Sequence, residues 1–121
     1  MTTTIVSRLE ADVRIRKCAE EYRQTLGMGH EEPIEMVLAA LSLSLGVTVP
    51  EHPFDEIVLA LSDLNAAELG DHPAIIRNRA LTVDNTADVI ARCHQELTCR
   101  VNELLDTLHF PGQWIIPGAA A

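Results

Sequence analysis

Aromatic residues are scarce in this sequence of 121 residues, which contains two Phe, one Tyr and one Trp although 47% of its residues are hydrophobic. A core of this composition must consist mainly of Leu, Ile, Val and Ala. Alternating runs of β-branched and aromatic residues, which are typical of β-strands, are nearly absent. The composition therefore favours an all-α fold. We expect a single domain, because a chain of this length buries roughly two-thirds of its unfolded surface around one core.

Long apolar runs are also missing. The longest run of hydrophobic residues that no Pro, Gly or polar residue interrupts is Met36 to Leu41, whereas a membrane-spanning helix needs roughly 20 residues. Charged residues appear at Arg8 and Glu10, before the apolar segment of a signal peptide could form. We therefore expect a cytoplasmic protein without a membrane partner. The single Lys against eight Arg indicates a bacterial source with a GC-rich genome.

Basic residues are absent from the centre of the chain. No Lys or Arg occurs between His30 and His72, whereas nine Asp and Glu residues do. Residues 31–71 therefore account for the whole formal net charge of −9, because the charges of the two flanking parts cancel. Such a surface disfavours nucleic acids and suits a basic protein partner. The acidic residues that we expect at an interaction surface are Glu31, Glu32, Glu35, Glu51, Asp55 and Glu56.

Two long amphipathic helices are predicted at the ends of the chain. The first covers residues 4–26, with Thr3 or Thr4 as its N-cap. The last covers residues 86–108 and follows Asn85, which is a good N-cap residue. The predicted apolar positions are Ile5, Val6, Leu9 and Val13 on one face of the first helix, Ile15, Cys18, Ala19, Tyr22 and Leu26 on another, and Ile90, His94, Leu97, Val101, Leu104 and Leu108 along the seam of the last.

Shorter helices are predicted in the middle, over residues 33–45, 53–69 and 74–81. The helix over residues 33–45 is apolar nearly all round, so it belongs either in a core or in an interface. We expect it to form, with the helix over residues 53–69, a buried layer between the two long helices. The resulting fold is a compact all-α bundle of four main helices plus one short helix.

The C-terminal tail is apolar and is interrupted by two Pro-Gly pairs. The single domain therefore divides into a helical bundle, residues 1–109, and a tail, residues 110–121. The tail is too apolar to remain in water, so we expect it to pack on the bundle or on a partner. Trp114, Ile115 and Ile116 complete the expected interaction surface.

Motifs for metal binding and catalysis are missing from the sequence. None of the five His residues has the spacing of a metal ligand set, and Cys93 and His94 are adjacent, so their side chains diverge by about 100° on a helix. Cys18, Cys93 and Cys99 lack the paired spacing of a disulfide framework. No glycine-rich phosphate-binding loop occurs. We therefore expect no metal, no cofactor and no catalytic residues.

The leading hypothesis for function is a non-enzymatic protein–protein interaction module, such as an adaptor, an inhibitor or an immunity-like protein. One alternative is a helical domain, or an enzyme, that binds a small molecule in a pocket near Cys93 and His94. Another alternative is a homodimer of unknown role. Its interface would be the tail or the apolar seam of the last helix.

Overall fold

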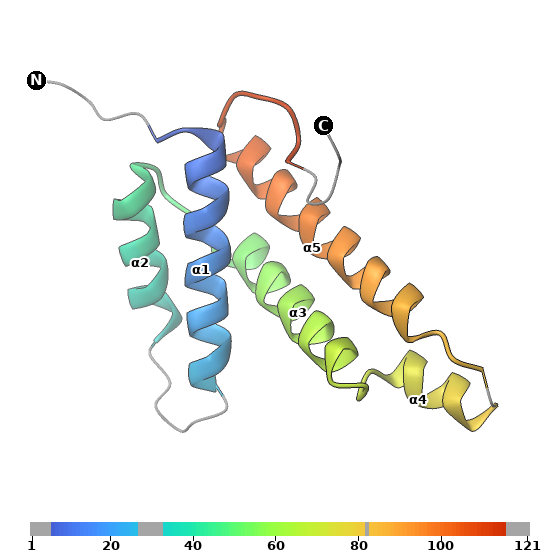
Figure 1. Cartoon of the computed structure of the whole chain (residues 1–121). Helices are drawn as coiled ribbons and strands as arrows, with labels where there is room; N and C mark the ends of the chain where they lie inside the picture. Colours follow the sequence, from blue (N-terminus) through green and yellow to red (C-terminus); the bar gives the residue numbers. More distant parts are fainter. Residues whose placement is uncertain (1–5, 27–32, 82, 116–121) are drawn as a thin grey trace, which may run out of the picture.

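Five α-helices make up the protein in its computed structural model, which describes residues 6–26, 33–81 and 83–115. No β-strand occurs within these residues. The prediction of an all-α bundle with one short helix is confirmed. The helices are α1 (Arg8–Leu26), α2 (Ile34–Leu45), α3 (Glu51–Glu68), α4 (Pro73–Ala80) and α5 (Thr86–Thr107) (Figure 1).

The helices pack in an order that differs in part from the predicted one. α3 and α5 run side by side and form the most extensive helix–helix contact, and α1 packs against both of them (Figure 1). α2 lies on the side of α1 away from α5, and α4 connects the far ends of α3 and α5. The predicted layer of two central helices is therefore half correct. α3 lies in the middle of the bundle, but α2 lies at its edge.

The core lies between α1, α3 and α5. Ile15 from α1, and Phe54 and Ile57 from α3, are completely buried. The ring of Phe54 packs at a tilt against that of Tyr22, with 6.1 Å between the ring centroids. Aliphatic side chains supply most of the remaining core, as the low aromatic content predicts. Burying each large side chain contributes about 1.5–3 kcal/mol.

The buried face of α5 matches the predicted seam only in its second half. His94 is exposed, so its predicted place in the seam was wrong, and Ile90 is half-buried at the edge of the core. In the first half of α5, every fourth residue is buried. The predicted seam followed a heptad spacing, which placed its first two apolar positions one residue too late along the helix. The buried residues of α5 are Val89, Cys93, Leu97, Thr98, Val101, Asn102, Leu104 and Leu105.

α1 begins later than predicted. Its first residue is Arg8, and the Ser7 Oγ accepts a hydrogen bond from the Glu10 backbone N–H at 3.1 Å. Ser7, rather than a Thr further upstream, is therefore the N-cap residue, in agreement with the preference of Ser for this position. Three residues of the predicted helix start, namely Thr3, Thr4 and Ile5, lie outside the described residues.

The inward face of α1 is polar in its first turns. Leu9 and Val13, which were predicted on an apolar contact face, are exposed, and Arg8 and Asp12 are buried instead. Hydrogen bonds explain the difference, because a buried charged group is tolerated only when it is paired. Asp12 binds the Arg16 side chain at 2.7 Å, and Arg8 binds four acceptors on α5 and the tail.

Candidate interaction surface

The side of α2 that faces away from α1 is apolar and exposed. Val37, Leu41 and Leu45 are the buried residues of this helix, and they face α1. On the opposite side, Met36 is 65% exposed and Leu43 is 86% exposed. Exposed apolar positions with a helical spacing form one continuous stripe. We call this stripe the α2 face, and it consists of Met36, Ala39, Ala40 and Leu43.

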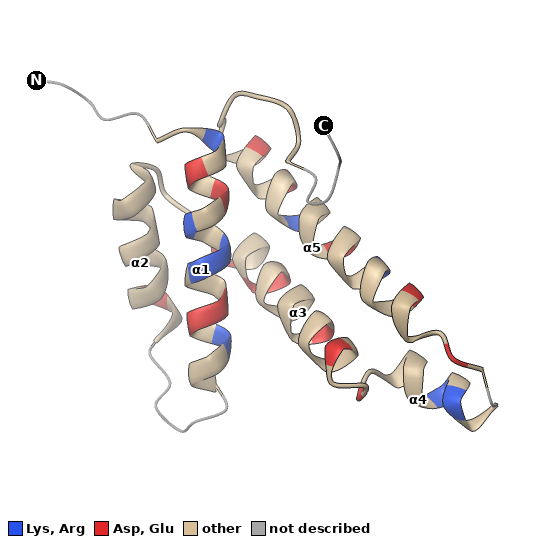
Figure 2. Cartoon of the chain, in the orientation of Figure 1, with Lys and Arg blue, Asp and Glu red and all other residues tan. Residues whose placement is uncertain are grey.

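The α2 face is uncharged, unlike the surface of the neighbouring helix. Figure 2 shows charged residues of both signs along the whole of α1, whereas α2 is charged only near its first turn, where Glu35 lies. Exposed apolar residues that occur singly are ordinary, but a contiguous apolar stripe is typical of an interaction site. The sequence allowed a core or an interface for this helix. In the structure only one narrow side of the helix is buried, and its outer residues are exposed.

Groups of opposite charge lie near the two ends of α2. At its C-terminal end, the Arg14 guanidinium of α1 donates a hydrogen bond to the Ser44 backbone oxygen at 2.6 Å and pairs with Glu10 at 3.1 Å. The final carbonyl groups of a helix carry partial negative charge, so a cation is favourable there. At its N-terminal end, Glu35 is exposed in the first turn. Charged groups of opposite sign therefore lie near the two ends of α2, beside the α2 face, and Arg14 is already paired with Glu10.

The predicted acidic surface is distributed over two helices. Glu35 lies in the first turn of α2, and Glu51 and Asp55 lie near the start of α3, which begins beside α1 (Figure 1). Within the described residues, no Lys or Arg forms an ion pair with these three. Glu56 is already paired within the chain, because its carboxylate binds Arg100 of α5 at 2.8 Å. Two further predicted residues, Glu31 and Glu32, lie outside the described residues.

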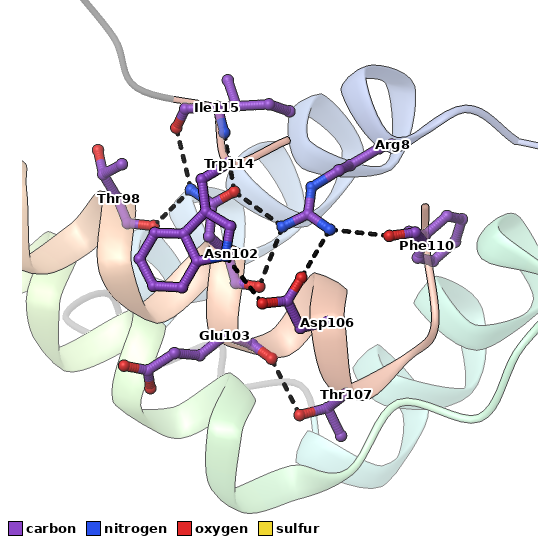
Figure 3. Close-up of polar contacts among 9 residues, drawn as sticks. All are labelled: Arg8, Thr98, Asn102, Glu103, Asp106, Thr107, Phe110, Trp114 and Ile115. Carbon is purple, nitrogen blue, oxygen red and sulfur yellow. Dashed lines mark hydrogen bonds and ion pairs between the residues drawn. The ribbon is translucent and has the colours of Figure 1, made fainter. Parts of the chain in front are cut away.

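The C-terminal tail packs on its own domain as far as residue 115. Asn102 of α5 is completely buried. Its Nδ2 donates to the Ile115 oxygen and its Oδ1 accepts from the Ile115 N–H, both at 2.9 Å (Figure 3). The Trp114 indole is 44% exposed and donates to the Asp106 carboxylate at 2.8 Å. Trp114 and Ile115 therefore stabilise the bundle. The third predicted tail residue, Ile116, lies outside the described residues.

Arg8 ties the start of α1 to the same group of residues. Its guanidinium donates to Asp106 and to the Phe110 backbone oxygen, each at 2.8 Å, and to the Asn102 side-chain oxygen at 3.0 Å (Figure 3). The hydrogen bonds from Arg8 and Trp114 hold the pKa of Asp106 below its usual range. Sequence reasoning missed Arg8 and Asn102. The local signal for Asn102 is its polar side chain in the middle of an apolar helix.

A cleft of about 240 Å³ opens between α3, α4 and α5. Asp63, His72 and Cys93 are among the residues that line it. Burial raises the pKa of the Cys93 thiol, and the negative charge of Asp63 raises it further. The thiol is therefore protonated, and weakly nucleophilic, at neutral pH. The cleft contains Cys93 of the predicted pocket but not His94, which is exposed at the next position of the helix.

Across the described ranges, no group of three His, Cys, Asp or Glu residues could hold a metal ion. None of the five helices found there is long and apolar enough to cross a membrane. Comparisons of the chain with protein-family models, with curated proteins and with solved structures found no significant match. Function must therefore be inferred from the geometry of this chain.

Proposed function

We propose that this protein is a non-enzymatic protein–protein interaction module that binds its partner through the α2 face. The exposed stripe from Met36 to Leu43 is the observation that carries the proposal. Burying a side chain of this size contributes about 1.5–3 kcal/mol. A partner that covers Met36 and Leu43, at the two ends of the stripe, therefore gains binding free energy from both. Apolar positions at this spacing are typical of helices that bind in a groove of another protein.

The charges near the α2 face support a partner that is apolar at its centre and basic at one edge. Glu35 and Glu51 are exposed at the starts of α2 and α3. Charged groups at the rim of an interface mainly set the association rate and the specificity, while the apolar centre supplies most of the affinity. An adaptor or an inhibitor that covers part of a basic protein fits this distribution.

We assign this module to the bacterial cytoplasm. Cys18, Cys93 and Cys99, all in the described part of the chain, form no disulfide. Thiols that remain reduced suit the reducing conditions of the cytoplasm. The strong preference for Arg over Lys in the sequence, eight residues against one, supports a bacterial source.

Photo-crosslinking tests the proposal. A benzophenone amino acid replaces Leu43 in one protein and Leu59 in another, because Leu59 is also apolar and is 64% exposed, but on α3. We expect a defined adduct in the source cells at position 43 only. Excess unlabelled protein should suppress the adduct, whereas the Met36→Ser variant should not. An adduct pattern that is the same at both positions, or no adduct at position 43, would overturn the proposal.

A second candidate function is small-molecule binding in the cleft between α3, α4 and α5. The observation that favours it is that three charged residues, Asp63, Arg92 and Glu96, line this cleft together with apolar residues and Cys93. A concave site with a few convergent polar groups is typical of a ligand pocket. A thermal-shift screen of amines and amino acids tests this candidate, because a ligand that binds the folded state raises its melting temperature. The Asp63→Asn variant should lose any such shift.

A further inference from the structure

We propose that the cleft between α3, α4 and α5 is one end of a longer groove, and that this groove binds a short peptide with a free amino group and a free carboxylate. This inference rests on the second candidate function, binding in the cleft, and adds the class of ligand. It is independent of the α2 face. Three features of the described residues favour it: the continuity of the groove, the charges along it, and its length.

A second hollow, of about 400 Å³, adjoins the cleft along α4 and α5. Ala74, Val89 and Arg92 line both of them. Ala74 and Arg77 of α4 are three residues apart, so they lie on the same side of that helix. The lining residues of α5 also have helical spacing on one side, and they are Asp88, Val89, Arg92, Cys93 and Glu96. The cleft and the second hollow therefore form one groove, which we call the α4–α5 groove.

The cations of the α4–α5 groove have no partner in the chain. In the described part of the protein, neither Arg77 nor Arg92 forms an ion pair. Each of five other arginines binds a carboxylate, namely Arg8, Arg14, Arg16, Arg23 and Arg100. The charged residues of α4 are both basic (Figure 2). Two guanidinium groups of this acidic protein are therefore available to a ligand.

The two ends of the α4–α5 groove differ in charge. Asp63 and Glu96 line the cleft end, where Arg100 binds Glu96 at 2.7 Å and Asp63 forms no ion pair. The other end contains Arg77 and one carboxylate, that of Asp88, and Arg92 lines both hollows. Two guanidinium groups and one carboxylate leave a net positive charge at this end.

A ligand with one charge of each sign matches this distribution. Guanidinium groups bind carboxylates through paired, charge-assisted hydrogen bonds. We therefore place the carboxylate of the ligand at Arg77 and Arg92, and its ammonium group at Asp63. The residues between these ends are small and apolar, since Val89 is 4% exposed and Ala74 is half-buried. A concave apolar floor with a few polar groups at its ends is typical of a ligand site.

The length of the α4–α5 groove selects a peptide over a single amino acid. Asp88 and Glu96 are eight positions apart on α5, which corresponds to about 12 Å at 1.5 Å per residue. An extended chain covers about 3.3–3.6 Å per residue, so about three residues fit along the groove. A single amino acid has its charged groups too close together to reach both ends.

Calorimetric titration of the purified full chain with tri-alanine measures binding. The N-acetylated and the C-amidated forms of the same peptide each lack one terminal charge. We expect saturable binding of tri-alanine, and binding about tenfold weaker or less for each blocked form, because each loses a charge-assisted contact. Equal affinities for the three peptides, or no saturable binding of tri-alanine, would overturn the inference.

Two variants assign the two ends of the peptide. Asp63→Asn should weaken the binding of tri-alanine but leave that of the N-acetylated form unchanged, because this form has no ammonium group. Arg77→Gln should weaken the binding of tri-alanine but leave that of the C-amidated form unchanged. The matched controls are Glu68→Gln on α3 and Arg79→Gln on α4, since Arg79 lines a different hollow. A loss of affinity that is the same in controls and variants would contradict these assignments.

Chemical shifts locate the bound peptide. In a titration followed by ¹H–¹⁵N correlation spectra, we expect the amide signals of Ala74, Val89 and Arg92 to move with tri-alanine and that of Leu43 to stay in place. Changes that leave these three signals unmoved would place the peptide outside the α4–α5 groove and overturn the inference.

The outcomes separate this inference from the functions proposed above. If tri-alanine does not bind but an amine or an amino acid raises the melting temperature in an Asp63-dependent way, the cleft binds a small molecule and only the peptide is overturned. If neither experiment detects a ligand, both the peptide and the second candidate function are overturned. Photo-crosslinking at position 43 tests the α2 face and depends on neither result.

Discussion

Arg8 and Asn102 are 94 residues apart in the sequence and meet inside the bundle. The Arg8 guanidinium donates to both oxygens of Asn102, at 3.0 Å to the side chain and 3.3 Å to the backbone. Asn102 also binds the backbone of Ile115, so one contact joins the start of α1, the middle of α5 and the tail. Two buried polar side chains therefore join the start of α1 to residue 115 of the tail.

Replacing Asn102 with Ala should destabilise the protein by about 3 kcal/mol, because the Ile115 backbone groups and the Arg8 guanidinium lose a buried partner. Urea denaturation followed by circular dichroism measures this change in the free energy of unfolding. Gln95→Ala is the matched control, because Gln95 is exposed on the same helix. If the two variants were equally stable, the Asn102 contacts would contribute nothing.

The Asp106 carboxylate should make stability depend on acid pH. Hydrogen bonds from Arg8, and then from Trp114, lower its pKa in the folded state. A lowered folded-state pKa means that the stabilisation is complete above the pKa of the unfolded chain and is lost as pH falls through the folded-state pKa. Asp106→Asn should therefore be less stable than the wild type at neutral pH, and the difference should shrink in acid. Urea midpoints across the acid range measure this difference.

The presence of the helices could be predicted from the sequence, but the position of α2 could not. Helical periodicity and capping residues lie within short segments, so they predict each helix in isolation. An apolar helix such as α2 has the same sequence pattern whether it lies in a core or in an interface. Its position depends on the packing of α1 against α3 and α5, which the sequence pattern does not contain. His94 was misplaced for a related reason, because a shift of one residue rotates a helix position by about 100°.

The candidate surface was predictable only in part. The apolar residues of α2 are visible in the sequence, and the structure shows which of them remain exposed. The contact of Arg8 with Asn102 has no sequence signal of comparable strength, because two polar residues far apart carry no periodicity. The tail was expected to pack on the bundle or on a partner, and the Trp114 indole N–H binds Asp106 while the residue stays 44% exposed. A single apolar residue in a tail does not reveal which surface covers it.

Cys93 should react with iodoacetamide several-fold more slowly than Cys99 at neutral pH, because Cys93 is buried and Cys99 is only half-buried. Burial and the charge of Asp63 raise the pKa of Cys93, so less of it is the reactive thiolate. Asp63→Asn should therefore speed the reaction of Cys93, whereas Asp71→Asn should not. Mass spectrometry of peptides from timed samples measures both rates. Equal rates for Cys93 and Cys99 would contradict this prediction.

Leu41 and Leu43 form a matched pair on α2, since they are 3% and 86% exposed. Leu41→Ala should lower the free energy of unfolding by about 3 kcal/mol, because it leaves a cavity against α1. Leu43→Ala should change it by less than about 0.5 kcal/mol, because this side chain is exposed. Urea denaturation at low concentration measures both changes. A large loss for Leu43→Ala would show that the α2 face stabilises the single chain.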